Sequence, residues 1–265
     1  MCEHVHMLVD QRHSLILDRI AANGAVRVAD LSTELGVSDM TVRRDIADLA
    51  ARGLVRKVHG GAVDARPSAH EPGFASKQSL ATAQKLAIAD AAMDLVPAGA
   101  SIALSAGTTT WALATRLAQR ADLRPLAVVT NSLPVADALH AAGDVGDVVL
   151  TGGSRTPSDA LVGPLTVAAL ETLHVDLLFL GTHGIDADAG LTTPNLLEAE
   201  TNRALARSAR RTVVVADSSK WGTLGMARFL TLDDIDVLVT DEGLPDDART
   251  LLADAGVRVI LAPAT

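Results

Sequence analysis

The sequence predicts an α/β protein in two parts, a small helical domain at residues 1–63 and a larger domain at residues 80–265. In the first part, apolar residues recur three and four positions apart in three short runs, which is typical of helices. In the second part, runs of Val, Ile and Leu alternate with helical patterns, which indicates a mostly parallel sheet covered on both faces. Residues 64–79, with Pro67, Pro72 and Gly73, predict a linker between them.

The composition excludes several other classes of protein. Of the 265 residues, 48% are hydrophobic and 21% are charged, which suits a globular chain and not a disordered one. The single cysteine, Cys2, cannot form an internal disulfide, and no export signal is visible, so we expect a cytoplasmic protein. The longest uncharged stretch, residues 95–115, contains one proline and two glycines, so we expect no membrane-spanning segment.

Three predicted helices fill the first domain, and a glycine suited to a helix end follows each of them. Their apolar positions are Ile16, Leu17 and Ile20, then Val28, Leu31 and Leu35, then Val42, Ile46 and Leu49, and the glycines are Gly24, Gly36 and Gly53. Only residues 36–38 separate the second helix from the third, and Ser38 can cap the third helix through its hydroxyl. This is the pattern of a helix-turn-helix. Residues 54–58 and 62–63 then predict two short strands around a glycine turn, which adds a wing.

The distribution of charge supports double-stranded DNA as a partner of this domain. Residues 1–66 hold nine basic and nine acidic residues, so the whole net charge of −9 falls on the rest of the chain. Residues 43–57 contain five basic and two acidic side chains, a local positive surface on a neutral domain. A three-helix module that binds another protein is the alternative. The expected DNA contacts are Ser38, Thr41, Arg43, Arg44, Arg56, Lys57, His59 and Gly60.

The second domain is predicted to contain seven strands and six helices. The strands are expected at residues 101–104, 126–130, 148–150, 177–180, 213–216, 237–239 and 257–261. The helices are expected near residues 80–96, 111–119, 135–141, 165–173, 197–209 and 246–255. Because the strands are short and apolar and helices lie between most of them, they predict a parallel sheet.

Glycines and polar residues follow these strands, where ligands bind in open parallel sheets. After the first strand, Ser105 and Gly107 lead into a helix through Thr108, Thr109 and Thr110. The unpaired N–H groups and the positive end of that helix favour an anion, although the same residues could serve only to cap the helix. The candidates after the later strands are Asn131, Gly152, Gly153, His183 and Lys220. We expect His183 to form hydrogen bonds in its loop and not to act as a catalyst.

The segments 38–46 and 53–62, from Ser38 to Ile46 and from Gly53 to Ala62, closely resemble the DeoR family of bacterial transcriptional regulators. The resemblance extends over nearly the whole chain. It implies a winged helix-turn-helix followed by a sensor domain that is ribose-5-phosphate isomerase-like and binds a phosphorylated sugar or a related metabolite. It also implies that Gly107, Thr108 and Thr109 hold phosphate and that Lys220 adds a cationic contact. The chain departs from the family pattern at Lys77, where arginine is frequent, and at Ser105, where aspartate is usual.

These observations predict a DNA-binding transcriptional regulator, a repressor of a carbohydrate catabolism operon that responds to a phosphorylated sugar or a similar anion. The alternative is a sugar-phosphate isomerase fused to a DNA-binding module, with Asp217, Glu198 and Glu200 as candidate acids and bases. The missing carboxylate at Ser105 weakens that alternative. We expect no enzyme activity, no cofactor and no metal. We also expect a homo-oligomer, a dimer or tetramer, because one helix-turn-helix makes too few contacts for useful specificity.

Overall fold

The computed structural model describes residues 9–23, 25–52, 54–64, 73–143 and 145–263. The chain divides between Pro72 and Gly73 into two compact units, an N-terminal unit and a larger unit. Each unit is described by itself below. Part of the segment predicted as a linker is helical, because α4 (Phe74–Gln78) lies within it.

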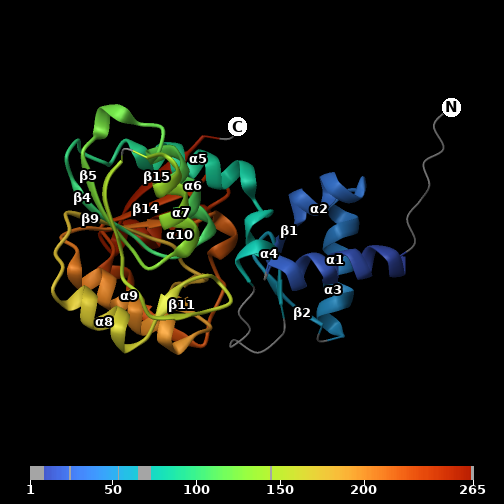
Figure 1. Ribbon diagram of the computed structural model, residues 1–265. Helices are drawn as coiled ribbons and strands as arrows, with labels where there is room; N and C mark the ends of the chain where they lie inside the picture. Colours follow the sequence, from blue (N-terminus) through green and yellow to red (C-terminus); the bar gives the residue numbers. More distant parts are fainter. Residues whose placement is uncertain (1–8, 24, 53, 65–72, 144, 264–265) are drawn as a thin grey trace. The chain divides into compact units, whose positions relative to one another are not determined.

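The N-terminal unit is a three-helix domain with a small sheet (Figure 1). Its elements are α1 (Val9–Asn23), β1 (Ala25–Arg27), α2 (Val28–Leu35), α3 (Asp39–Ala51), β2 (Val55–Val58) and β3 (Gly61–Asp64). The strands are antiparallel in the order β1-β3-β2. The predicted helix-turn-helix and wing are confirmed, and β1 is an unpredicted third strand that closes the sheet. A side chain at Gly61 would place its Cβ 1.9 Å from the Val26 carbonyl oxygen, so only glycine permits this approach of β1 and β3.

The core of this unit is built from the apolar positions that predicted its helices. All of them are buried except Leu17, which is half-buried. Gly36 has a φ of 64° and ends α2 in the left-handed conformation, as expected. Gly24 and Gly53, predicted to end the other two helices, lie outside the described residues.

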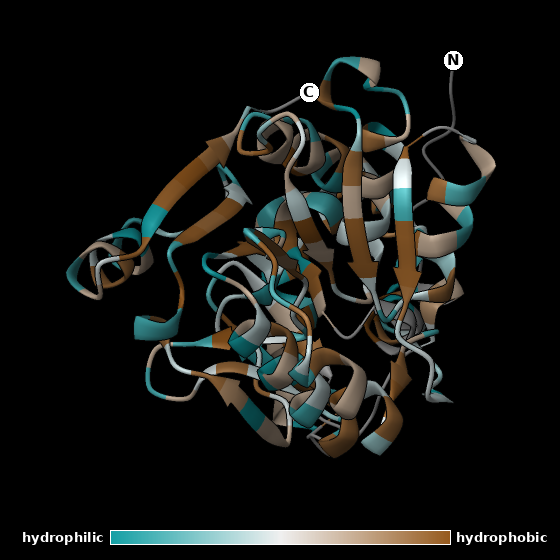
Figure 2. Ribbon diagram, turned by 60° about the vertical axis from the view of Figure 1, so that its left-hand side comes forward, coloured by the Kyte–Doolittle hydropathy of each residue, from teal (hydrophilic) through white to brown (hydrophobic). Residues whose placement is uncertain are grey.

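The larger unit contains a seven-stranded parallel sheet in the order β15-β14-β12-β9-β4-β5-β6. The strands are β4 (Ser101–Leu104), β5 (Leu126–Thr130), β6 (Gly146–Leu150), β9 (Leu177–Leu180), β12 (Thr212–Val215), β14 (Val237–Asp241) and β15 (Arg258–Ala262). All seven predicted strands are therefore confirmed. The strands of the sheet that are visible in Figure 2 are coloured mostly as hydrophobic, which is expected for a sheet between two layers of helices.

Two helical layers cover the sheet (Figure 1). The first is α5 (Thr82–Met93), α6 (Thr108–Leu117) and α7 (Leu133–Ala141), which share a core with Ile102, Phe179 and Val239. The second is α8 (Pro164–Glu171), α9 (Leu196–Ser208) and α10 (Asp246–Asp254), which share a core with Leu178 and Val214. The architecture is a three-layer α/β/α sandwich, as the alternating pattern predicts.

The larger unit also contains strands that the sequence did not predict. A hairpin is formed by β7 (Ser154–Arg155) and β8 (Leu161–Val162). A three-stranded antiparallel sheet is formed by β10 (Gly184–Asp186), β11 (Gly190–Thr193) and β13 (Ala227–Leu230). Among the helices described, none combines the length and apolar character that a bilayer crossing requires.

Candidate DNA-reading helix and carboxyl-edge site

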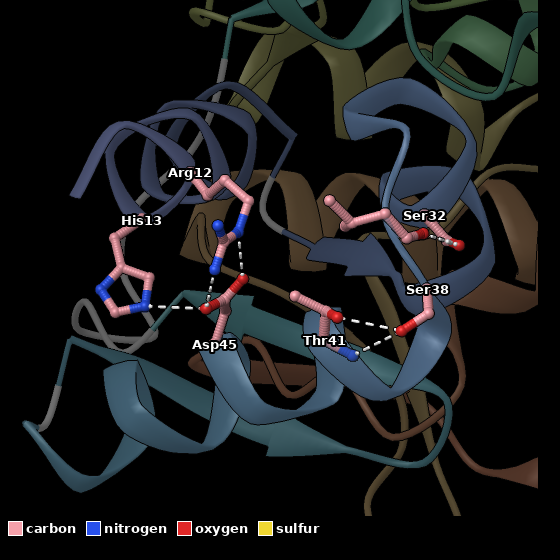
Figure 3. Close-up of polar contacts among 7 residues, drawn as sticks. Arg12, His13, Ser32, Ser38, Thr41 and Asp45 are labelled. Carbon is pink, nitrogen blue, oxygen red and sulfur yellow. Dashed lines mark hydrogen bonds and ion pairs between the residues drawn. The ribbon is translucent and has the colours of Figure 1, made fainter. Parts of the chain in front are cut away.

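The start of α3 is fixed by hydrogen bonds from the turn before it (Figure 3). The Ser38 hydroxyl oxygen accepts a hydrogen bond from the Thr41 backbone N–H at 3.2 Å and lies 2.9 Å from the Thr41 hydroxyl oxygen. Ser32 donates its hydroxyl to the Val37 carbonyl at 2.6 Å, which closes the turn between α2 and α3. Ser38, predicted as a DNA contact, therefore caps this helix, and Thr41, also predicted as one, is its hydrogen-bond partner.

A buried ion pair holds α3 against α1 (Figure 3). Asp45 on α3 accepts hydrogen bonds from Arg12 on α1, at 2.8 Å from Nε and 2.9 Å from Nη2. Nε2 of His13, also buried, lies 3.3 Å from the Asp45 carboxylate. The sequence prediction missed this contact, although Asp45 occupies the apolar stripe of Val42, Ile46 and Leu49 and could have been suspected to need a buried partner.

The opposite face of α3 and the wing present cationic side chains to solvent. Arg43 and Arg44 are exposed, as are Arg56, Lys57, His59 and Gly60 around the β2–β3 turn. Met40 and Ala47 are also exposed on α3, so the exposed face combines arginines with uncharged residues. An α-helix that presents arginines near its N-terminus suits the major groove. That these residues contact DNA stays a prediction.

Internal hydrogen bonds bring the carboxyl ends of β4, β5 and β9 together. The buried Asn131 side chain accepts from the Ala106 backbone N–H at 3.0 Å and donates to the Leu161 carbonyl at 3.1 Å. The Ser105 hydroxyl oxygen, fully buried after β4, accepts from the Gly181 N–H after β9 at 2.9 Å. Asn131 and Ser105 were predicted as ligand contacts, and here they join the loops of the strand ends.

The start of α6 keeps the features of an anion site. Gly107 precedes the helix, and no side chain caps it. Thr110 donates its hydroxyl to the Gly107 carbonyl at 2.9 Å, so its role is within the helix. Thr108 and Thr109, in the first turn, are 9% and 7% exposed. The N–H groups of a first helical turn have no carbonyl partner within the helix and can bind an anion.

The glycine pair after β6 is explained in part by packing. Thr166 on α8 donates its hydroxyl to the Gly152 carbonyl at 2.7 Å. A Cβ at Gly153 would lie 2.2 Å from the Thr166 hydroxyl oxygen, so this position requires glycine for packing. A Cβ at Gly152 would meet no atom within 4 Å, so only Gly152 borders open space. His183, after β9, and Lys220, after β12, are half-buried.

A buried lysine that the sequence prediction missed lies near the same edge. Lys85, in the first turn of α5, is 6% exposed and donates from Nζ to the Lys77 carbonyl at 2.6 Å. Burial lowers the pKa of Lys85 to about 8, with the carboxylate of Asp217 opposing this effect and the charges of Lys220 and Lys77 adding to it. A signal was present in the sequence, because Lys85 precedes Ile88, Ala89 and Ala92 at helical spacing on their buried face.

The candidate catalytic carboxylates of the isomerase alternative have different hydrogen-bond partners and different exposure. Glu198 accepts hydrogen bonds from Thr156 and Ser158, which fixes the loop after β7. Asp217 accepts from the Ser219 backbone N–H at 3.1 Å, and Glu200 is exposed on α9. No group of three His, Cys, Asp or Glu side chains suited to a metal occurs in the part of the chain that the structure describes.

A winged helix-turn-helix joined to an α/β unit with a polar carboxyl edge defines a two-domain DNA-binding regulator. Residues 12–67 match the model of the DeoR-like helix-turn-helix domain, and residues 80–242 match that of the DeoR C terminal sensor domain. The chain belongs to the DeoR family of transcriptional regulators.

Curated relatives align along almost the whole chain. A candidate aga operon transcriptional repressor of Escherichia coli O157:H7 is 37% identical over 95% of this chain and 93% of its own. The regulator GlpR of Haloferax volcanii is 36% identical over 96% of this chain and 98% of its own. The glycerol-3-phosphate regulon repressor of Escherichia coli K12 is 30% identical over 95% of this chain and 98% of its own.

Among solved structures, ribose 5-phosphate isomerase A of Methanocaldococcus jannaschii is 21% identical to this chain. The alignment covers 52% of this chain and 53% of that one, with a TM-score of 0.38. The isomerase-like character of the larger unit stays an expectation from the family resemblance.

Proposed function

We propose that this protein represses a carbohydrate catabolism operon and that a phosphorylated sugar or a similar organic anion controls its binding to the operator. The observation that carries the proposal is the combination of a capped, arginine-bearing α3 with a second unit in which polar strand ends lie beside the start of α6, a helix that no side chain caps. Relatives named as repressors, one of them of the glycerol-3-phosphate regulon, support both the repressor role and the class of effector.

In this proposal, Arg43 and Arg44 read or position the operator. Both side chains are exposed, while Val42, Ile46 and Leu49 form the buried face of the same helix. Replacing a base-reading arginine with alanine should weaken operator binding by about 1–3 kcal/mol, and replacing a phosphate-contacting one should reduce the salt dependence of binding.

The test uses a DNA fragment that the purified protein selects from a genomic pool. Arg43→Ala and Arg44→Ala are compared with Arg52→Ala, which removes the same charge from an exposed position just after α3. We expect the first two variants to bind that fragment less tightly and the third to bind nearly as the parent does. Unchanged affinity in both test variants would mean that the recognition helix is wrongly assigned.

For the effector, the N–H groups at Gly107, Thr108 and Thr109 bind the phosphate, and Lys220 adds positive charge. A thermal-shift screen of sugars with and without phosphate tests this assignment, because a ligand of the folded state raises its stability. We expect stabilisation by phosphorylated compounds only. Stabilisation by unphosphorylated sugars alone would contradict an anion site.

We further propose that the protein is not an enzyme, acts in the cytoplasm and is at least a dimer. Ser105 leaves no carboxylate at the position where the family usually carries aspartate, and Glu198 holds a loop in place. Turnover of ribose 5-phosphate, followed by NMR, would contradict the proposal that the protein is not an enzyme. A monomer by light scattering, both free and on DNA, would contradict the proposed oligomer.

A further inference from the structure

The helix α4 is the first element of the larger unit, and it follows directly on the chain that leads from the N-terminal unit. Three of the contacts that it makes within this unit bear on its role. The Phe74 N–H donates to the Pro157 carbonyl at 3.1 Å, and the Phe74 ring packs edge-on against Trp111, with 6.2 Å between the ring centroids. The third contact is the hydrogen bond from Lys85 Nζ to the Lys77 carbonyl. Because Trp111 belongs to α6, α4 lies against the helix that begins at the candidate anion site.

The third contact joins α4 to the Lys85 ammonium, a charged group with more hydrogen-bond donors than acceptors around it. A lysine ammonium carries three N–H donors. Among the described residues, the Lys77 carbonyl is the one hydrogen-bond acceptor of Lys85, and no carboxylate lies within ion-pair distance of it. Asp217, Lys220 and Lys77 act on it electrostatically from a longer range. A buried cation with two further donors and two neighbouring lysines is suited to binding an anion.

We propose that Lys85 binds the anionic group of the effector, and that this transfers its hydrogen bond from the Lys77 carbonyl to the anion and loosens α4. The proposal rests on the anion site of the proposed function and adds to it a binding residue and a route out of the larger unit. A bond between an ammonium and a phosphate is stronger than one between an ammonium and a neutral carbonyl, so the anion is the better acceptor. Burial lowers the pKa of Lys85, and an adjacent anion favours the charged form again.

Hydrogen–deuterium exchange of the full chain, with and without inorganic phosphate, tests the proposal. Peptides covering residues 107–112 report binding at the start of α6, and peptides covering residues 73–81 report on α4. We expect phosphate to slow exchange in the first segment and to speed it severalfold in the second. Lys85→Met should weaken phosphate binding about tenfold or more and abolish the response of residues 73–81.

Lys77→Met is the matched control, because it removes a charge near the site but keeps the backbone carbonyl that Lys85 binds. It should preserve the response of residues 73–81. Lys85→Gln provides a second neutral variant in case Lys85→Met does not fold, which circular dichroism would reveal. Lys85→Gln should also weaken phosphate binding and abolish the response of residues 73–81.

The possible failures are distinguishable. If phosphate changes the exchange of neither segment in the parent protein, the anion site of the proposed function is wrong and the coupling falls with it. If residues 107–112 are protected while residues 73–81 exchange as before, the site stands and the coupling through α4 is overturned. If both Lys85 variants keep the full response of the parent, Lys85 is not the connecting residue.

Discussion

Replacing the buried lysine of α5 should change the stability of the larger unit in a strongly pH-dependent way. In the folded protein, burial lowers the pKa of Lys85 from its ordinary value of 10.5 to about 8, because the ammonium is removed from water. Between these two values the unfolded chain binds more protons than the folded one, so the free energy of unfolding rises with pH. Below pH 8 the cost of the buried charge is fully present and amounts to about 3 kcal/mol.

Lys85→Met removes this cost. We therefore expect the stability of the variant relative to the parent to be greatest at pH 7 and to fall by about 3 kcal/mol across the window from pH 8 to 10.5. At pH 7 the net gain is smaller than that figure, because the hydrogen bond to Lys77 is also lost.

Urea unfolding followed by tryptophan fluorescence measures the free energy of unfolding of the larger unit, since Trp111 and Trp221 both lie in it. Lys220→Met, at a half-buried lysine nearby, is the control. Because the charge of Lys220 adds to the lowering of the Lys85 pKa, this variant should narrow the pH window and keep most of the pH dependence of the parent, since burial is the larger cause. A stability difference between Lys85→Met and the parent that stays constant from pH 7 to pH 10.5 would refute the reasoning.

Three further substitutions test the packing and the site. Asp45→Asn removes the carboxylate that accepts two hydrogen bonds from the Arg12 guanidinium and should destabilise the N-terminal unit by about 3 kcal/mol in calorimetry; a loss below about 1 kcal/mol would show that the pair contributes little. Gly153→Ala forces a methyl group against Thr166 and should cost about 1–3 kcal/mol in thermal unfolding, so unchanged stability would contradict the packing described. Ser105→Asp should alter the profile of stabilising anions in a thermal-shift screen and leave operator affinity without ligand nearly intact; identical profiles would show that position 105 does not influence the ligand.

The main elements of the fold could be predicted because their side chains repeat with a clear period. The five inner strands of the parallel sheet are largely buried and therefore appear as short apolar runs. The edge strands β6 and β15 are partly exposed but still carry consecutive apolar residues, and the three N-terminal helices carry apolar residues at spacings of three and four. The strands that were missed lack such a pattern. β7 is exposed and only two residues long, and β10 and β11 contain glycine and polar residues whose burial depends on contacts distant in sequence.

The candidate site could be located from the sequence, but the roles of its side chains could not. Polar residues after parallel strands indicated the carboxyl edge, yet a sequence does not show whether a hydroxyl or amide faces a ligand or a neighbouring loop. Ser105 and Asn131 form internal hydrogen bonds at that edge. Lys85 and Asp45 were missed for the opposite reason, because a charged residue in a helical pattern usually faces solvent and only the tertiary fold shows it to be buried.

Selection of genomic DNA fragments by the purified protein, followed by binding titrations at one fixed salt concentration, tests most directly that the protein is an effector-controlled repressor. The enriched fragments should share repeated half-sites and bind about a thousandfold or more tightly than scrambled DNA of the same length. Adding the phosphorylated sugar that most stabilises the protein should shift this affinity, while its unphosphorylated form should not. Fragments that bind no more tightly than scrambled DNA, or an affinity that no phosphorylated sugar changes, would contradict the account.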